Sequence, residues 1–299
     1  HRDVPGPRPP EFPEFESTNT AAQFDGKGAH FSFPDSGPTS ALDFTNGDAI
    51  TLEAWVNLTE IAANETVSII GKGRTGNPGF AQDNQNWTLR LREKTGAACV
   101  NFLFATPRNT EQATKDAHWH RWTSAEGFTP NSGWHHVAVT YRFGDASSIR
   151  GWIDGRALKG SWDMGGPTAE APINDDDAVW IGSTNKASAA NSLRGMLDAV
   201  AIHREALTSE VLSKRYQRIG DAVVAKPAPE VMPDLGALTP GKVRVTFHQN
   251  FPSISRWLNE GETLPKENMQ WETERFLLPR LPLLHDDWGI RDAWKGPVL

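Results

Sequence analysis

Hydrophobic residues recur at every second position in several short runs between about residues 20 and 205. In the run 49–58, Ile50, Leu52 and Val56 would share one face of an extended strand, because successive side chains of a strand point to opposite faces. Similar runs, separated by Gly, Asn, Asp or Pro, read SIIGKG, NWTLRLR, CVNFLFAT, WHHVAVTYR, SIRGWIDG and AVWIGS. Short strands at this spacing, without a helical period between them, predict an all-β antiparallel sandwich or barrel.

Local signals add a hairpin and one helix to this picture. The Asp-Gly pair in WIDGRAL is typical of a tight turn between two antiparallel strands. The segment LTSEVLSKRYQRIG begins with a capping residue, Thr208 or Ser209, and runs to Gly220. We therefore expect a short helix over about residues 208–218.

The distribution of proline divides the chain into four parts. Residues 1–19 are proline-rich and predict an extended arm, and a β domain is expected over 20–220. Residues 221–240 predict a linker, and residues 241–299 predict the start of a second domain or a packed tail, because they are too apolar for disorder. The chain begins with a histidine and stops at WKGPVL, and we expect both ends to be cuts in a longer protein.

Composition narrows the classes of function. The chain has 299 residues and a formal net charge of −7, without the basic footprint expected of a nucleic-acid-binding protein. No apolar run approaches the roughly 18 residues of a membrane span. Cys99 is the one cysteine, so an intrachain disulfide is impossible, and we expect it to be a small core residue.

Four pieces, in this order, carry a family resemblance: FDGKGAHFSF; ITLEAWVNL followed by SIIGKG; GWHHVAVTY followed by IRGWIDGRAL; and VWIGS followed by LRGMLDAVAIHREALTSEVLSKRY. Residues 20–218 thereby resemble the laminin-G-like branch of the concanavalin A-like lectin/glucanase jelly-roll family. The resemblance implies a two-sheet antiparallel jelly roll. It also implies an extracellular or periplasmic module of a larger bacterial protein, with a concave β surface that binds glycan or a partner domain.

The chain does not show the residues that catalysis requires in this family. Retaining glucanases carry several acids on one strand, with the two catalytic carboxyls about 5–5.5 Å apart. The corresponding strand here holds Glu53 alone, since Glu60 lies beyond its end. The set of residues used by the lyases of the fold is also absent, so we predict a protein without catalytic activity.

Two alternatives to a binding module remain open. One is a purely structural spacer between neighbouring domains. The other is a glycan-active enzyme that draws part of its site from the C-terminal region, for instance from Glu272, Glu274, Asp286 or Asp287.

The candidate ligand site is the stretch DAHWHRWTSAEGF. In an extended strand, His118, His120 and Trp122 share one face, while Trp119 and Arg121 share the other. Aromatic rings beside polar groups suit a sugar ligand, and we predict that His118, Trp119, His120 and Trp122 bind glycan. The alternatives are an ordinary strand whose tryptophan fills the core, or a zinc site at the two histidines, for which no third ligand is indicated.

An aspartate inside an apolar strand is the candidate metal ligand. Burying Asp198 within MLDAVAI is costly unless something pairs with it. The family resemblance implies a structural calcium there, with Asp25 and the carbonyl oxygens near Gly47 as companions, because calcium prefers oxygen ligands. Hydrogen bonds from backbone amides, or a pair with Arg194, are the alternative. For the acidic run 175–177 we expect a solvated turn rather than a second ion site.

Overall fold

The structure is a computed structural model, and it describes residues 3–108 and 117–218. The predicted linker and the predicted second domain lie outside the described residues, as do the four acids of the enzyme alternative. The elements in chain order are β1 (Val4–Pro5), β2 (Thr20–Asp25), β3 (Phe31–Phe33), β4 (Ala49–Leu58), β5 (Thr66–Lys72), β6 (Trp87–Lys94), β7 (Ala97–Ala105), β8 (Trp119–Phe128), β9 (His135–Arg142), β10 (Asp145–Ile153), β11 (Arg156–Leu158), β12 (Gly160–Met164), β13 (Val179–Ile181), a 3-10 turn (Ala189–Asn191), β14 (Arg194–His203) and α1 (Ser209–Ser213).

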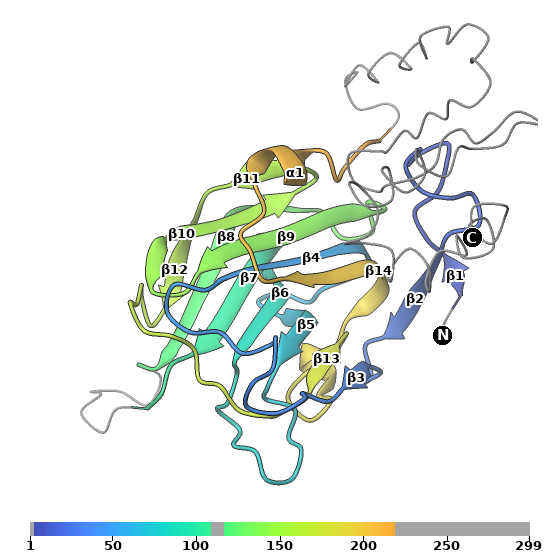
Figure 1. Cartoon of the computed structure of the whole chain (residues 1–299). Coiled ribbons are helices and arrows are strands. Elements are labelled where there is room, and N and C mark those ends of the chain that lie inside the picture. Colours follow the sequence, from blue (N-terminus) through green and yellow to red (C-terminus); the bar gives the residue numbers. More distant parts are fainter. Residues whose placement is uncertain (1–2, 109–116, 219–299) are drawn as a thin grey trace, which may run out of the picture. The chain divides into compact units, whose positions relative to one another are not determined.

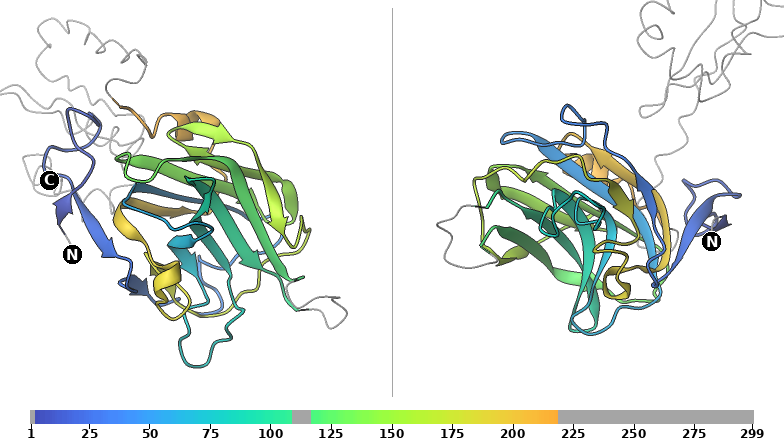
Figure 2. Two further views of the ribbon diagram at one scale, coloured as in Figure 1. Left: turned by 180° about the vertical axis from the view of Figure 1, so that it is seen from behind. Right: turned by 90° about the horizontal axis from the view of Figure 1, so that it is seen from below.

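These strands form two antiparallel sheets of seven strands each. The first sheet has the order β1-β2-β14-β4-β9-β10-β11, and the second has the order β12-β8-β7-β6-β5-β13-β3. Figure 1 shows the first sheet, with β4, β9 and β14, in front of the second, and Figure 2 gives two further views of the layers. The predicted all-β, two-sheet jelly-roll sandwich is confirmed.

The core lies between the sheets and uses the alternation read from the sequence. Ile50, Leu52 and Val56 of β4 are fully buried, and they belong to the same apolar cluster as Phe102 and Phe104 of β7 in the other sheet. Burying one such side chain stabilises the folded state by about 1.5–3 kcal/mol. Cys99 is buried too, as expected.

Both local signals are found, with one difference in length. Asp154 and Gly155 connect β10 to β11 with positive φ angles of 53° and 72°, as a tight hairpin turn requires. Helix α1 begins after Thr208, whose side chain accepts a hydrogen bond from the amide of Val211. It ends at Ser213, well before Gly220, because the next amides bond to carbonyls three residues back and tighten the last turn.

The outer face of the first sheet is covered by the chain itself. Phe12 and Phe15 of the N-terminal segment meet the ring of Trp55 edge-on, each with 5.0 Å between ring centroids. Tyr216, which follows α1, stacks on Trp55 at 5.6 Å. Leu212 of α1 is buried against the same sheet. These segments therefore occupy part of the outer face of the first sheet.

Candidate functional site

Strand β8 presents its predicted ligand-binding residues to two different environments. Trp122 is 3% exposed and lies in the core, opposite Phe102 of β7. Glycines make room for its ring, since a Cβ at Gly160 would lie 2.2 Å from the Trp122 side chain. His120 is buried beside Phe104, with 5.3 Å between ring centroids. The alternative of a core tryptophan therefore describes Trp122.

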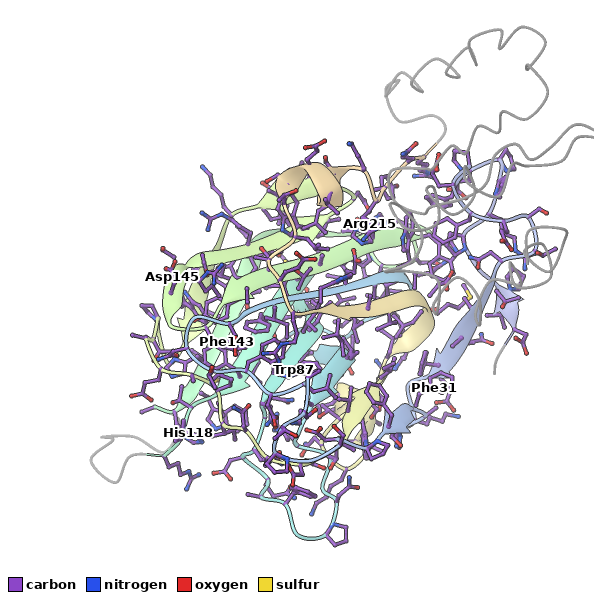
Figure 3. All side chains as sticks on the ribbon, in the orientation of Figure 1. Phe31, Trp87, His118, Phe143, Asp145 and Arg215 are labelled. Atoms are coloured by element: carbon purple, nitrogen blue, oxygen red, sulfur yellow. The ribbon has the colours of Figure 1, made fainter. Side chains whose placement is uncertain are left out.

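His118 is also buried, 1% exposed, at the end of the sandwich where β8 begins (Figure 3). Its Nε2 lies 3.7 Å from Asp83. Within residues 3–108 and 117–218, no group of three or more His, Cys, Asp or Glu side chains is placed to hold a metal ion, so the geometry gives no support to zinc. The prediction of ligand binding by His118, His120 and Trp122 is corrected by their placement, because buried side chains offer no surface to a sugar.

Trp119 has the opposite orientation and keeps its place as a candidate. Strand pairing sets Trp119, Arg121 and Thr123 opposite Ala105, Leu103 and Asn101 of β7, on the face turned away from the core. Trp119 and Arg121 are both partly exposed. The exposed aromatic ring predicted for β8 is thus Trp119.

A hydrogen-bond network runs across this outer face from β6 to β12. Arg90 Nε donates to Asn101 Oδ1 at 2.9 Å, and Asn101 Nδ2 donates to Thr123 Oγ1 at 2.8 Å. Thr123 Oγ1 donates to Asp163 Oδ2 at 3.0 Å, and Arg121 Nε donates to Asp163 Oδ1 at 2.7 Å. The network holds the guanidinium groups of Arg90 and Arg121 in fixed positions on this face.

Two further arginines join this face. The guanidinium carbon of Arg74 lies 5.3 Å from the ring centroid of Trp119, a cation–π distance. Arg92 Nη1 donates to Thr66 Oγ1 at 3.3 Å. Burial is the main cause that lowers the pKa of Arg90 well below its ordinary value, and the positive charges of Arg74, Arg121 and Arg92 lower it further. These four arginines, which we call the arginine cluster, are therefore close enough to act on one another.

Arg74 is held by a loop that Asp177 anchors. Asp177 is fully buried, and its carboxylate accepts hydrogen bonds from Thr75 Oγ1 at 2.7 Å, Asn77 Nδ2 at 3.1 Å and Asn84 Nδ2 at 3.0 Å. The expectation of a solvated turn is wrong for this residue. Its donors are hydroxyl and amide groups from the loop between β5 and β6, so the buried charge is compensated without an ion.

Some polar groups of the outer face have no partner among the described residues. Asn86 directly precedes β6, and both its amide atoms are buried without a hydrogen bond. Ser68 Oγ on β5, opposite Arg90, is in the same state. Each buried polar atom without a hydrogen bond lowers the stability of the fold by roughly 1–3 kcal/mol. Apolar side chains at these positions would avoid that cost.

Glu53, the one acid of the strand that could have been catalytic, faces the other side of the sandwich. It is 5% exposed and accepts hydrogen bonds from His136 Nε2 at 3.0 Å and His203 Nε2 at 2.8 Å. Arg215, just after α1, lies 3.2 Å from it (Figure 3). Glu53 therefore fixes the segment after β14 to the first sheet and is covered by it.

The three residues of the calcium prediction do not come together. In the strand register, Arg194 of β14 lies opposite Asp25 of β2, and Gly195 lies opposite Leu58, the last residue of β4. Gly47 precedes the other end of β4. At about 3.3 Å per residue, Asp25 and Gly47 are separated by more than about 30 Å along the sheet. The amide of Gly47 instead donates a hydrogen bond to Phe143 O, and its carbonyl oxygen accepts one from Arg142 Nη1.

One partner of Asp198 is a backbone amide, as named in the alternative to calcium, and the other is a side-chain amide. It is half-buried at a bulge of β14, where Ala199 has a φ of 45°. Its Oδ2 accepts from Asn19 Nδ2 at 2.6 Å, and its Oδ1 accepts from the amide of Ala199 at 2.7 Å. It also lines a cavity of about 310 Å³, together with Asp3 and several apolar side chains. Arg194 pairs with Glu65 instead, at 2.9 Å.

The fold is an antiparallel β-sandwich of two seven-stranded sheets. Residues 25–213 match the family described as the concanavalin A-like lectin/glucanases superfamily, which is well over half of the chain. The chain belongs to this superfamily. A comparison with curated proteins finds no match. Among the described residues, no helix is long and apolar enough to cross a membrane.

Solved structures are similar to this chain at a low level. The native heptameric SAP-like pentraxin of Limulus polyphemus is 15% identical, with a TM-score of 0.40, over 71% of this chain and 79% of the pentraxin. The Ruminococcus gnavus IT-sialidase CBM40 bound to α2,3 sialyllactose is 15% identical, with a TM-score of 0.40, over 63% of this chain and 97% of that one. The Trypanosoma rangeli sialidase in complex with the inhibitor DANA is 19% identical, with a TM-score of 0.40, over 65% of this chain and only 27% of the sialidase.

Proposed function

We propose that this chain is a non-catalytic carbohydrate-binding domain whose ligand lies on the outer face of the second sheet. The observation that carries the proposal is Trp119, a partly exposed ring on that face, with the partly exposed Arg121–Asp163 pair two residues further along β8. An aromatic ring can stack on the apolar face of a sugar, while neighbouring polar groups orient its hydroxyls. Membership of the superfamily supports the same function.

The absence of catalysis is part of the proposal. Asp163, the carboxylate of the polar network, is engaged by Arg121 and Thr123, and Glu53 is buried under the chain on the other side of the sandwich. The glycan should therefore leave the protein unchanged. Detection of shortened products from a bound oligosaccharide would contradict this part.

The experiment is binding to a glycan array, followed by titration calorimetry of the best oligosaccharide. Trp119→Ala should weaken binding at least tenfold, because truncation of an aromatic anchor typically costs more than about 1.4 kcal/mol. Phe33→Ala is the matched control, since Phe33 is an exposed aromatic residue of the edge strand β3. Equal binding by both variants would refute the site, provided that their melting curves match the wild type.

The proposal includes the setting in which the domain works. We place it in a larger exported bacterial protein, where a glycan-binding domain would meet its ligand outside the cytoplasm. This part rests on the family resemblance. Fractionation of the producing cells, with the protein followed by antibody, tests the location.

A further inference from the structure

The outer face of the second sheet carries more positive charge than its own carboxylates balance. The arginine cluster supplies four cations, Arg74, Arg90, Arg92 and Arg121. Asp163 pairs with Arg121, whereas Arg74, Arg90 and Arg92 form no ion pair among the described residues. The whole chain has a net charge of −7, so this local excess runs against the average.

The cluster is built into the sheet and does not consist of loose surface side chains. Arg90 is only 5% exposed, and its Nε is fixed by Asn101. Its two terminal nitrogens make no hydrogen bond with the described residues. A guanidinium group held in this way is costly to leave unpaired, and an anion would offset that cost.

Aromatic and cationic groups meet at one point of this face. Arg74 reaches over Trp119 from the loop that Asp177 anchors, and Arg121 projects from β8 two residues beyond Trp119. Guanidinium groups bind carboxylates and sulfate esters through paired N–H donors, and they do so with fixed geometry. A ring that can stack on a sugar thus lies beside donors suited to an anion.

We infer that the ligand of this domain is an acidic glycan, in which a carboxylate or sulfate group is received by Arg74 and Arg121, with the buried positive charge of Arg90 nearby, while a sugar ring stacks on Trp119. This inference rests on the proposed function and narrows it to a substrate class. Arg92, which has a hydrogen bond to Thr66, adds charge at the side of the site. Neutral glycans would lack the group that compensates the arginine cluster.

The test compares matched pairs of glycans that differ in charge alone. The pairs are sialyllactose with lactose, tetragalacturonate with its carboxyl-reduced form, and a heparin octasaccharide with its desulfated, N-acetylated, carboxyl-reduced form. We expect at least one acidic member to bind tenfold or more tightly than its neutral partner, with an affinity that falls as salt rises. The first two pairs probe carboxylates, and the third probes sulfate, so the panel also separates the two sources of charge.

Variants connect the effect to the arginine cluster. Arg74→Gln should weaken binding of the acidic member about tenfold more than binding of the neutral member, because only the acidic member carries a group that Arg74 would pair with. Arg121→Gln is a second variant with the same expectation. Arg156→Gln is the matched control. Arg156 lies on β11, an edge strand of the first sheet, and its side chain is 64% exposed and paired with Glu126.

Three outcomes would overturn the inference, and they are distinguishable from failure of the proposed function. Equal binding of the acidic and neutral members, lost in Trp119→Ala, refutes the acidic ligand but keeps the carbohydrate-binding domain. Acidic binding that is unchanged in Arg74→Gln and Arg121→Gln refutes the assigned residues. Equal binding of a DNA oligonucleotide and of the acidic glycan refutes the glycan as the specific ligand, because the arginine cluster would then attract any polyanion. No binding to any glycan of the array refutes the proposed function itself.

Discussion

Replacing Glu53 with Gln would remove the negative charge that His136, His203 and Arg215 share. Glu53 is 5% exposed, but the side chains of His203 and Arg215 are 27% and 39% exposed, so solvent screens part of their attraction. Breaking a buried ion pair from one side costs about 3–5 kcal/mol. Because of the screening, we expect the lower end, a loss of about 3 kcal/mol in the free energy of unfolding.

Urea denaturation followed by circular dichroism measures this loss. For a domain of this size, about 3 kcal/mol corresponds to a fall of about 6–12 °C in Tm. Glu126→Gln is the control, because Glu126 and its partner Arg156 are both 64% exposed, and an exposed pair is worth no more than about 1 kcal/mol. If the two variants were equally stable, the argument that Glu53 fixes the C-terminal segment to the first sheet would be refuted.

The pH dependence gives a second, independent check. Burial alone would raise the pKa of Glu53, but the hydrogen bonds from His136 and His203 outweigh it and hold the pKa well below its ordinary value. A carboxyl whose folded pKa is lowered contributes stability that is fully present above its unfolded pKa, about 4.3, and is lost as the pH falls further. The difference between wild type and Glu53→Gln should therefore narrow as the pH falls below about 4.

Three further changes test the placement of single residues. Trp122→Ala should lower the free energy of unfolding by about 3–5 kcal/mol in urea denaturation, and a loss under about 1 kcal/mol would contradict its place in the core. The backbone amide of Thr75 donates to Asp177 at 3.3 Å, so Asp177→Asn should increase hydrogen exchange of that amide and weaken glycan binding through Arg74. Unchanged exchange would show that Asp177 does not anchor the loop. Calcium should leave the Tm of the wild type unchanged, since Asp198 is engaged by Asn19; a calcium-dependent rise that Asp198→Asn abolishes would restore the calcium prediction.

The strands and their inward faces could be predicted from the sequence because they follow from local rules. Alternation alone placed Ile50, Leu52 and Val56 in the core, since a strand with one buried face needs an apolar side chain at every second position. The Asp154–Gly155 turn was predictable for the same reason, because few residue pairs adopt two successive positive φ angles. Those signals, with the ordered family pieces, were sufficient for the fold.

The orientation of β8 was beyond such rules. Both faces of that strand carry a tryptophan, so the pattern separates Trp119 from Trp122 without showing which of them is inside. The packing of distant strands determines which tryptophan is buried. Gly151 and Gly160 leave space for the ring of Trp122, and nothing in the sequence near Trp122 indicates that these two glycines contact it. Asp198 has the same difficulty, since its partner Asn19 is 179 residues away.

The arginine cluster depends entirely on tertiary structure. Arg74, Arg90 and Arg121 come from a loop and two non-adjacent strands, and in the sequence each of them resembles an ordinary solvated residue of an acidic chain. Strand register and the loop anchored on Asp177 bring their charges to one face. Alternation along a strand reports which side chains share a face, whereas the charge of that face is a sum over neighbouring strands, and pairing across the sheet determines which strands contribute to it.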